Sequence, residues 1–191
     1  MERRAQILDA AIEVFGQQGY RQGSLRDVAD AVGLSVQGVL HHFPTKEALL
    51  LETLERRSTV RRERTDKILA EQGVFPLMRF FLEENLARPP LMRLFVTLAA
   101  EATDPSHPAH SYFVKRYVAT HDVVRTAYLA AVAAGQAVDI DADVAAEQII
   151  ALCDGLQLQF LLRPGMDLLS AYDVAVDHLR LGGSDSDRRP R

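Results

Sequence analysis

The chain has 191 residues, of which 48% are hydrophobic and 25% are charged, and its formal net charge is −4. This length fits one domain or a small domain joined to a larger one, and the composition is typical of a soluble globular protein rather than of a disordered or collagen-like chain. The negative charge excludes a chain-wide basic field, so any contact with nucleic acid has to come from a local patch.

Three further features indicate the cellular location. Cys153 is the single cysteine, which excludes an internal disulfide and a cysteine-rich zinc site and favours a reducing compartment. Asp9 and Glu13 interrupt the N-terminal apolar segment, which is therefore not a signal peptide. No apolar stretch reaches the roughly 18 residues that are needed to cross a bilayer. We therefore expect a cytoplasmic protein that spans no membrane.

Helical periodicity runs along almost the whole chain. Apolar residues recur three and four positions apart, and no alternating run predicts a strand, so we expect an all-α fold of about nine helices. Residues 182–191 are polar and rich in Gly, Ser, Asp and Arg, which predicts a disordered tail. The expected helices cover about residues 3–17, 25–32, 36–42, 46–72, 74–87, 90–103, 107–134, 141–162 and 167–181.

Two short helices follow one another closely after Ser24. Ser24 is a typical N-cap, Asp27 completes a capping box three residues later, and Ser35 is the expected N-cap of the next helix. The link Gly33-Leu34-Ser35 has the length of the turn in a helix-turn-helix motif, whose second helix can enter a DNA major groove. The alternative is a pair of adjoining helices in an ordinary bundle, because helix–Gly–helix corners are common.

The segments around this motif carry a wider pattern. They are Ile7-Leu8-Asp9-Ala10-Ala11, Phe15, Gly19-Tyr20, Ser24-Leu25-Arg26-Asp27-Val28-Ala29, Val32-Gly33-Leu34-Ser35, His42-Phe43 and Lys46-Glu47-Ala48-Leu49-Leu50. With them, about the first fifty residues resemble the DNA-binding domain of the TetR family of transcriptional regulators. The resemblance implies a three-helix head whose third helix reads the major groove, and a C-terminal body that forms dimers and usually binds a small effector.

The third helix departs from the family pattern at three positions. Gln37 stands where the family usually has a glycine, and Leu40 stands where it usually has a tyrosine that contacts a phosphate. That contact is not available from Leu40. Gly38 occupies a place where a side chain often contacts a base in the family, although a glycine lets the backbone come close to the duplex.

The candidate DNA contacts lie on this helix and at the edges of the head. Gln37 can pair with adenine, and Val36 can pack on a thymine methyl group. Lys46 stands in the first turn of the next helix, whose free N–H groups also favour an anion. The resemblance extends the set to Arg26, because the family often has a DNA-contacting arginine there. The expected DNA-binding residues are Arg26, Ser35, Val36, Gln37, Gly38, His42, Thr45 and Lys46.

Cations are scarce in the head, and this limits how it can bind DNA. Residues 1–50 contain five Lys and Arg against six Asp and Glu. Binding then depends on where a few cations are placed and not on bulk charge. Arg3 and Arg4 are further candidates as an N-terminal arm. For each cation the alternative is a solvated surface charge.

The helix at 141–162 is apolar on nearly all sides, so it needs cover on two faces. One face carries small residues and leucines, and together with the helix at 167–181 it would form half of a four-helix interface with a twin subunit. The alternative is a larger monomeric bundle. The expected dimer-interface residues are Ala151, Gly155, Leu158, Leu162, Leu169, Tyr172 and Val176.

Aromatic and polar residues of the body indicate a pocket for a small molecule. Aromatic side chains with an occasional polar group are typical of such pockets, although an ordinary aromatic core has the same composition. The expected ligand-binding residues are Phe80, Phe95, Phe113, Tyr117, His121 and Gln157.

These expectations combine into one function. Residues 1–46 form a helix-turn-helix DNA-binding domain and residues 47–181 a ligand-binding and dimerisation domain. The expected protein is a homodimeric, sequence-specific transcriptional regulator, and more specifically a repressor because the family mostly represses. A small-molecule effector would release it from a palindromic double-stranded DNA operator. No cofactor and no metal are expected.

Two other functions stay open. Gly38 and Leu40 leave room for a helical small-molecule-binding protein that does not bind DNA. A small helical enzyme would use His107, His110 and His121, with or without a metal ion. No HExxH motif, carboxylate pair at ligand spacing or nucleophile motif supports such an enzyme, so we do not expect one.

Overall fold

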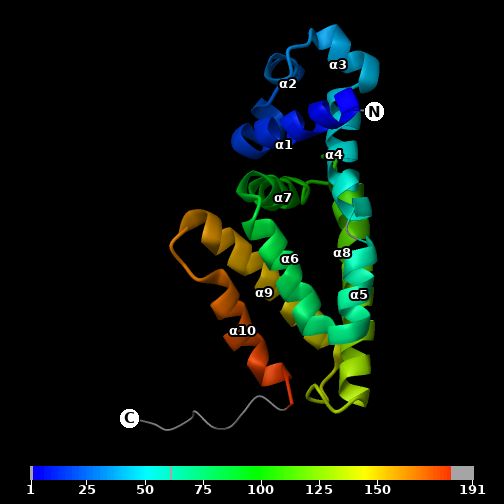
Figure 1. Cartoon of the computed structure of the whole chain (residues 1–191), viewed down its shortest axis with the longest axis vertical. Helices are drawn as coiled ribbons and strands as arrows, with labels where there is room; N and C mark the ends of the chain where they lie inside the picture. The colour runs from blue at the N-terminus through cyan, green and yellow to red at the C-terminus, as the bar shows by residue number, and fades with distance from the viewer. Residues whose placement is uncertain (1, 61, 182–191) are drawn as a thin grey trace. The chain divides into compact units, whose positions relative to one another are not determined.

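The computed structural model of the chain describes residues 2–60 and 62–181, and the side chains of these residues except 56–60, 62 and 63 (Figure 1). The described residues form ten α-helices and no strand, which confirms the all-α fold. The helices are α1 (Glu2–Gln22), α2 (Leu25–Ala31), α3 (Val36–His42), α4 (Lys46–Val60), α5 (Arg62–Gln72), α6 (Val74–Leu86), α7 (Pro89–Glu101), α8 (His110–Ala133), α9 (Ala142–Leu162) and α10 (Leu168–Val176), followed by a short 3-10 helix at Asp177–Leu179.

Helix boundaries depart from the expected ones at four places. The helix expected at 3–17 continues as α1 to Gln22, across a kink at Gly19, where φ is +78°. The single helix expected at 46–72 is described as α4 and α5, on either side of residue 61, which lies outside the described residues. The helix expected from residue 107 begins at His110, after turns in which the Asp104 carboxylate accepts a hydrogen bond from the Ser106 N–H at 2.9 Å. The last α-helix stops at Val176. The tail expected at 182–191 also lies outside the described residues.

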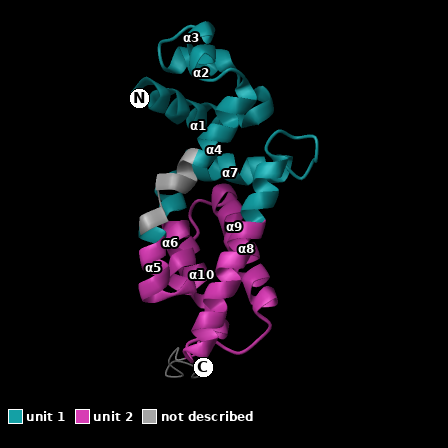
Figure 2. Ribbon diagram, turned by 90° about the vertical axis from the view of Figure 1, so that its right-hand side faces the viewer, with its two compact units in different colours: residues 1–65, 84–117 teal, residues 66–83, 118–191 magenta. Residues whose placement is uncertain are grey.

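The chain divides into two compact units (Figure 2). One comprises residues 1–65 and 84–117, and the other comprises residues 66–83 and 118–191. This division differs from the domain boundary expected after residue 46, because α7 packs along α1. A Cβ atom added at Gly16 would lie 2.5 Å from the Pro90 carbonyl oxygen, so only glycine allows this close approach.

The core of the first unit fixes the orientation of α3. Val39 and Phe43 are fully buried with Phe15 of α1 and Leu50 of α4 in one apolar cluster. The opposite face of α3 is therefore turned outward. Burying the apolar face of so short a helix is what holds it in place, since seven residues are too few to be stable in isolation.

The second unit is held by apolar packing and by two buried tyrosines. The Tyr128 hydroxyl donates to the Val138 carbonyl at 2.7 Å, and the Tyr172 hydroxyl donates to the Phe75 carbonyl at 3.0 Å. The α9 residue Ile149 is fully buried. None of the described helices combines the length and the apolar character required to cross a membrane.

Candidate nucleic-acid interface

The segment from Ser24 to Phe43 folds as a capped helix-turn-helix. The Ser24 hydroxyl accepts from the Asp27 N–H at 3.1 Å, and the Asp27 carboxylate accepts from the Ser24 N–H at 2.9 Å, which completes the expected capping box. Gly33 has φ +64°, a left-handed backbone conformation that residues other than glycine rarely adopt, and it makes the turn into α3. The sequence-based interpretation of this segment is confirmed.

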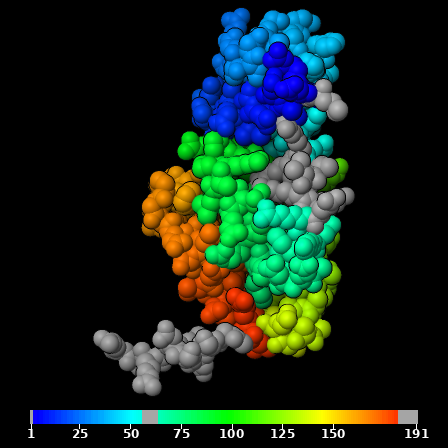
Figure 3. Space-filling model, in the orientation of Figure 1, coloured from blue at the N-terminus to red at the C-terminus, as the bar shows by residue number. Residues whose placement is uncertain are grey.

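The outer face of α3 is polar and compact. Gln37 is exposed, as are Ser35 and His41, whereas Gly38 and His42 are half-buried. Val36 is also half-buried and packs partly against the core, so it can offer only part of its side chain to a thymine methyl group. In the space-filling view the light-blue residues of α2 and α3 lie at the molecular surface (Figure 3). An exposed polar face on a short helix is suited to contacting base edges in a major groove.

Two hydroxyl groups cap the helices that flank this face. The Ser35 hydroxyl accepts from the Gly38 N–H at 3.1 Å at the start of α3, and the Thr45 hydroxyl accepts from the Ala48 N–H at 3.0 Å at the start of α4. Each hydroxyl still has its own proton to donate. Both groups can therefore cap a helix and donate to a phosphate oxygen at once.

The half-buried Lys46 side chain lies against the end of α1. Its ammonium lies 4.4 Å from the centroid of the Tyr20 ring and donates a hydrogen bond to the Arg21 carbonyl at 3.4 Å. Desolvation by partial burial lowers the pKa of Lys46, while the nearby Glu101 carboxylate acts to raise it. A phosphate contact from Lys46 therefore requires its side chain to leave this position.

The remaining candidate cations differ in how freely their side chains can contact DNA. Arg26 is exposed on α2, as the DNA-contacting role requires. Arg4 forms an ion pair with Glu52, in which Nη1 and Oε1 are 2.7 Å apart, and its guanidinium lies 4.4 Å from the centroid of the Phe43 ring. Arg4 thus connects α1, α4 and the end of α3, and its expected role with Arg3 as an N-terminal arm stays a prediction.

Models of two known protein families together match most of the chain. Residues 7–53 match the model of the bacterial regulatory proteins of the tetR family, and residues 76–181 match that of the BetI-type transcriptional repressor, C-terminal. The chain belongs to the TetR family. Its head and its body each match a family model, whereas the resemblance noted in the sequence extended only over the head.

Individual relatives of the family agree with this assignment. Over 120 residues the chain is 31% identical to the HTH-type transcriptional repressor KstR2 of Rhodococcus jostii (strain RHA1), an alignment that covers 61% of the chain and 52% of that protein. The chain spans about half the length of the curated relatives it matches, or less.

Two solved structures show the same fold. A transcriptional-regulator structure from Saccharomonospora viridis in complex with choline superposes with a TM-score of 0.80 at 22% identity, covering 94% of this chain and 98% of that one. The SmeT–triclosan complex superposes with a TM-score of 0.78 at 20% identity, covering 100% and 99%.

The six residues expected to bind a ligand are divided between the two compact units, and their role stays a prediction. Phe95, Phe113 and Tyr117 belong to the first unit, and Phe80, His121 and Gln157 to the second. Phe95 and Phe113 are buried and meet edge to face, with ring centroids 6.1 Å apart. Phe80 is buried too, and the Gln157 side-chain amide donates to the Cys153 carbonyl at 3.0 Å. His121 Nε2 lies 3.7 Å from an Asp143 carboxylate oxygen.

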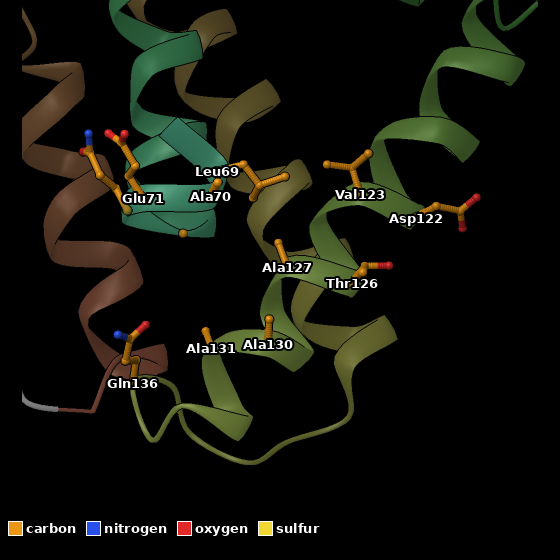
Figure 4. Close-up of a pocket in the computed structure, with 12 residues that line it drawn as sticks. Leu69, Ala70, Glu71, Asp122, Val123, Thr126, Ala127, Ala130, Ala131 and Gln136 are labelled. Atoms are coloured by element: carbon orange, nitrogen blue, oxygen red, sulfur yellow. The ribbon is translucent and has the colours of Figure 1, made fainter. Parts of the chain in front are cut away.

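A groove of about 620 Å³ lies elsewhere in the second unit, and none of those six residues lines it. Leu69 at the end of α5 and Val123 of α8 point toward each other across it (Figure 4). Ala127, Ala130 and Ala131 of α8 contribute short side chains that leave the space open. Sequence reasoning missed this groove, because a run of alanines equally predicts close helix packing.

The expected dimer residues separate into an exposed set and a buried set. On α9, Leu158 and Leu162 are 49% and 75% exposed, Ala151 is exposed, and a Cβ added at Gly155 would meet no atom within 4 Å. On α10, Leu169 is half-buried. Tyr172 and Val176, by contrast, are each 1% exposed in a single chain, so they pack in its core. The prediction that they lie in the dimer interface is therefore wrong. Sequence reasoning missed Val174, which is 75% exposed.

The histidines expected for an enzyme do not gather into a metal site. No group of three or more His, Cys, Asp or Glu side chains within the described ranges could hold a metal ion. The His110 Nδ1 atom lies 2.8 Å from the Ala102 carbonyl, and His107 Nδ1 accepts from the Ala109 N–H at 3.2 Å. These contacts stabilise the turns between α7 and α8.

Proposed function

We propose that the chain is a homodimeric, sequence-specific transcriptional repressor that leaves a palindromic DNA operator when a small-molecule effector binds. The observation that carries the proposal is the orientation of α3. Its apolar residues Val39 and Phe43 are buried, and Gln37 is turned outward within a capped helix-turn-helix. KstR2, the relative named above, is itself a transcriptional repressor. The assignment to a family of regulators supports a role that involves no catalysis.

Dimerisation would use the exposed apolar stripe of α9 with α10. Leu158 and Leu162 lie four positions apart on α9, and Val174 is exposed on α10. Large apolar side chains this exposed are typical of protein–protein interfaces when they form a continuous stripe. A twin copy would cover the stripe and hold two α3 helices about 34–36 Å apart, one turn of DNA.

The effector would act on the second unit. The groove between α5 and α8 is of the size that small molecules occupy, and its floor is apolar. Two solved structures with the same fold are complexes with choline and with triclosan, which supports a body that takes small organic compounds. The effector has to bind the DNA-free form more tightly than the DNA-bound form, and a difference of about 1–3 kcal/mol would lower operator affinity roughly 5- to 150-fold.

A selection from a random duplex pool tests the DNA-binding role. We expect the wild-type chain to enrich a palindromic sequence and to retard it in an electrophoretic shift. Gln37→Ala should relax preference at one base pair in each half-site, because it removes a base contact. Gln17→Ala, on an exposed position of α1, is the matched control and should leave the preference unchanged. A chain that enriches no sequence contradicts the proposal.

A further inference from the structure

Four titratable side chains meet around the end of α1. They come from four different segments, and we call them the Glu101 cluster: Tyr20, Lys46, Glu101 and His107. The Lys46 ammonium lies 4.4 Å from the Tyr20 ring centroid, and the Tyr20 and His107 ring centroids are 5.4 Å apart in an edge-to-face arrangement. All four belong to the first compact unit.

The Glu101 carboxylate is held against the end of α1, although one of its oxygens has no hydrogen-bond partner. Oε2 lies 3.5 Å from His107 Nε2, and both atoms are buried without a hydrogen bond. The His107 side chain is 3% exposed, and its Nδ1 accepts from the Ala109 N–H, so Nε2 carries the ring proton and faces the carboxylate. The other oxygen, Oε1, lies 3.6 Å from where a Cβ atom on Gly19 would stand.

The Lys46 ammonium also lies at the end of α1. Its hydrogen bond to the Arg21 carbonyl and its position over the Tyr20 ring put the ammonium at the end of α1, where the Glu101 carboxylate also lies beside Gly19. Partial burial lowers the pKa of Lys46, and the Glu101 carboxylate is the larger of the two charges that oppose this shift, ahead of Asp27. The Glu101 carboxylate therefore favours the charged Lys46 ammonium electrostatically.

We propose that Glu101 is a positioning residue that competes with a DNA phosphate for the Lys46 ammonium. The proposal rests on the DNA-binding function proposed above. A phosphate at the N-terminus of α4 must draw Lys46 away from the Tyr20 ring and the Arg21 carbonyl, and the attraction to Glu101 opposes this movement. The competition matters because residues 1–50 hold only five Lys and Arg. Glu101 is the last residue of α7, so any displacement of α7 changes how firmly Lys46 is held.

A double-mutant cycle tests this role. The full-length wild type, Glu101→Gln, Lys46→Met and the double variant are titrated against a duplex that the wild type selects from a random pool. Glu101→Gln should lower the Kd about three- to tenfold, within the range of couplings measured for neighbouring groups. Lys46→Met should weaken binding and reduce the slope of log K against log salt by about 0.9, the value of one phosphate contact. In the Lys46→Met background, Glu101→Gln should leave the Kd unchanged.

Two controls separate this competition from a structural role and from a simple change of net charge. Glu13→Gln removes one negative charge from an exposed position of α1 and should tighten binding far less than Glu101→Gln. Glu101→Asp keeps the charge but withdraws it by one methylene, so it should fold even if Glu101→Gln does not, and it should tighten binding by a smaller factor. Thermal unfolding of every variant confirms that each is folded at the assay temperature.

The outcomes distinguish the two proposals. The role of Glu101 is overturned if Glu101→Gln changes the Kd equally in the wild-type and Lys46→Met backgrounds. It is also overturned if Glu101→Gln and Glu101→Asp both weaken DNA binding. Either result leaves the DNA-binding function intact. A wild-type chain that selects no duplex overturns both.

Discussion

Replacing Gly16 by alanine is expected to destabilise the chain, whereas the same replacement at Gly38 is expected to stabilise it. Both glycines lie inside helices, α1 and α3. A Cβ atom at Gly16 would come within 2.5 Å of the Pro90 carbonyl oxygen, a backbone atom that no rotamer change can move. A Cβ atom at Gly38 would meet nothing closer than 3.5 Å, which is ordinary van der Waals contact.

The magnitudes follow from these distances. Alanine is favoured over glycine inside a helix by about 0.8–1.0 kcal/mol. At Gly38 nothing opposes this gain, so we expect a stabilisation of about 0.5–1 kcal/mol. At Gly16 the clash forces α1 and α7 apart, and overpacking of this kind costs about 1–3 kcal/mol. We expect the upper part of that range, and hence a net destabilisation of about 1–2 kcal/mol after the helix gain.

Urea unfolding followed by circular dichroism measures both variants against the wild type. Protein concentration has to be fixed, because the proposed dimerisation would make the midpoint concentration-dependent. For a chain of this size, 1 kcal/mol corresponds to about 2–4 °C in Tm, so the two variants should differ by several degrees in thermal unfolding. A Gly16→Ala variant as stable as Gly38→Ala would refute the close approach of α1 to α7.

Three further predictions follow from the described contacts. Leu162→Glu should raise the dimer dissociation constant at least about tenfold in analytical ultracentrifugation, because it removes a leucine worth roughly 1.5–3 kcal/mol when buried and adds a charge. Asp27→Asn should reduce the loss of stability in acid, because hydrogen bonds from Ser24 lower the pKa of Asp27 in the folded chain. The Asp27 carboxylate therefore adds stability at pH values above its pKa in the unfolded chain, near 4. This contribution is lost as the pH falls through the lowered pKa of the folded chain. Urea titrations at several pH values measure this. Ala130→Phe should fill the groove and abolish the effector response in a shift assay while leaving DNA affinity unchanged.

Each of these variants has a matched control on the same helix. Gln148→Glu on α9 adds a charge away from the leucines, Asp30→Asn on α2 removes a carboxylate that takes no part in the capping box, and Ala133→Phe enlarges an exposed residue that does not line the groove. An unchanged dissociation constant for Leu162→Glu, an acid profile of Asp27→Asn like that of the wild type, or a full effector response by Ala130→Phe would each contradict the corresponding prediction.

The head was predictable because its signals are local. The capping box at Ser24 and the turn at Gly33 depend on residues within a few positions of each other, and the burial of Val39 and Phe43 follows from their four-residue spacing. The DNA-facing role of Gln37 and its neighbours remains a prediction, since it depends on a duplex.

The remaining features depend on residues that are distant in sequence. Lys46 has the position of a phosphate contact, and only the fold shows that it lies over Tyr20. Tyr172 and Val176 fit the helical pattern of an interface, but apolar periodicity does not distinguish a core from a partner, and both are buried within the chain. The contact of Gly16 with Pro90 leaves no periodic signal at all.

The close fit of Gly16 against Pro90 bears on how regulators of this kind can be recombined. Residues 84–117 share a compact unit with the reading head, although residues 66–83 separate them from it along the chain. A chimera that transplants only the first fifty or so residues onto another body would leave the α1 surface without its native cover. Swapped operator specificity should therefore survive best when the graft carries α7 along with the head, or when only the outward side chains of α3 are exchanged.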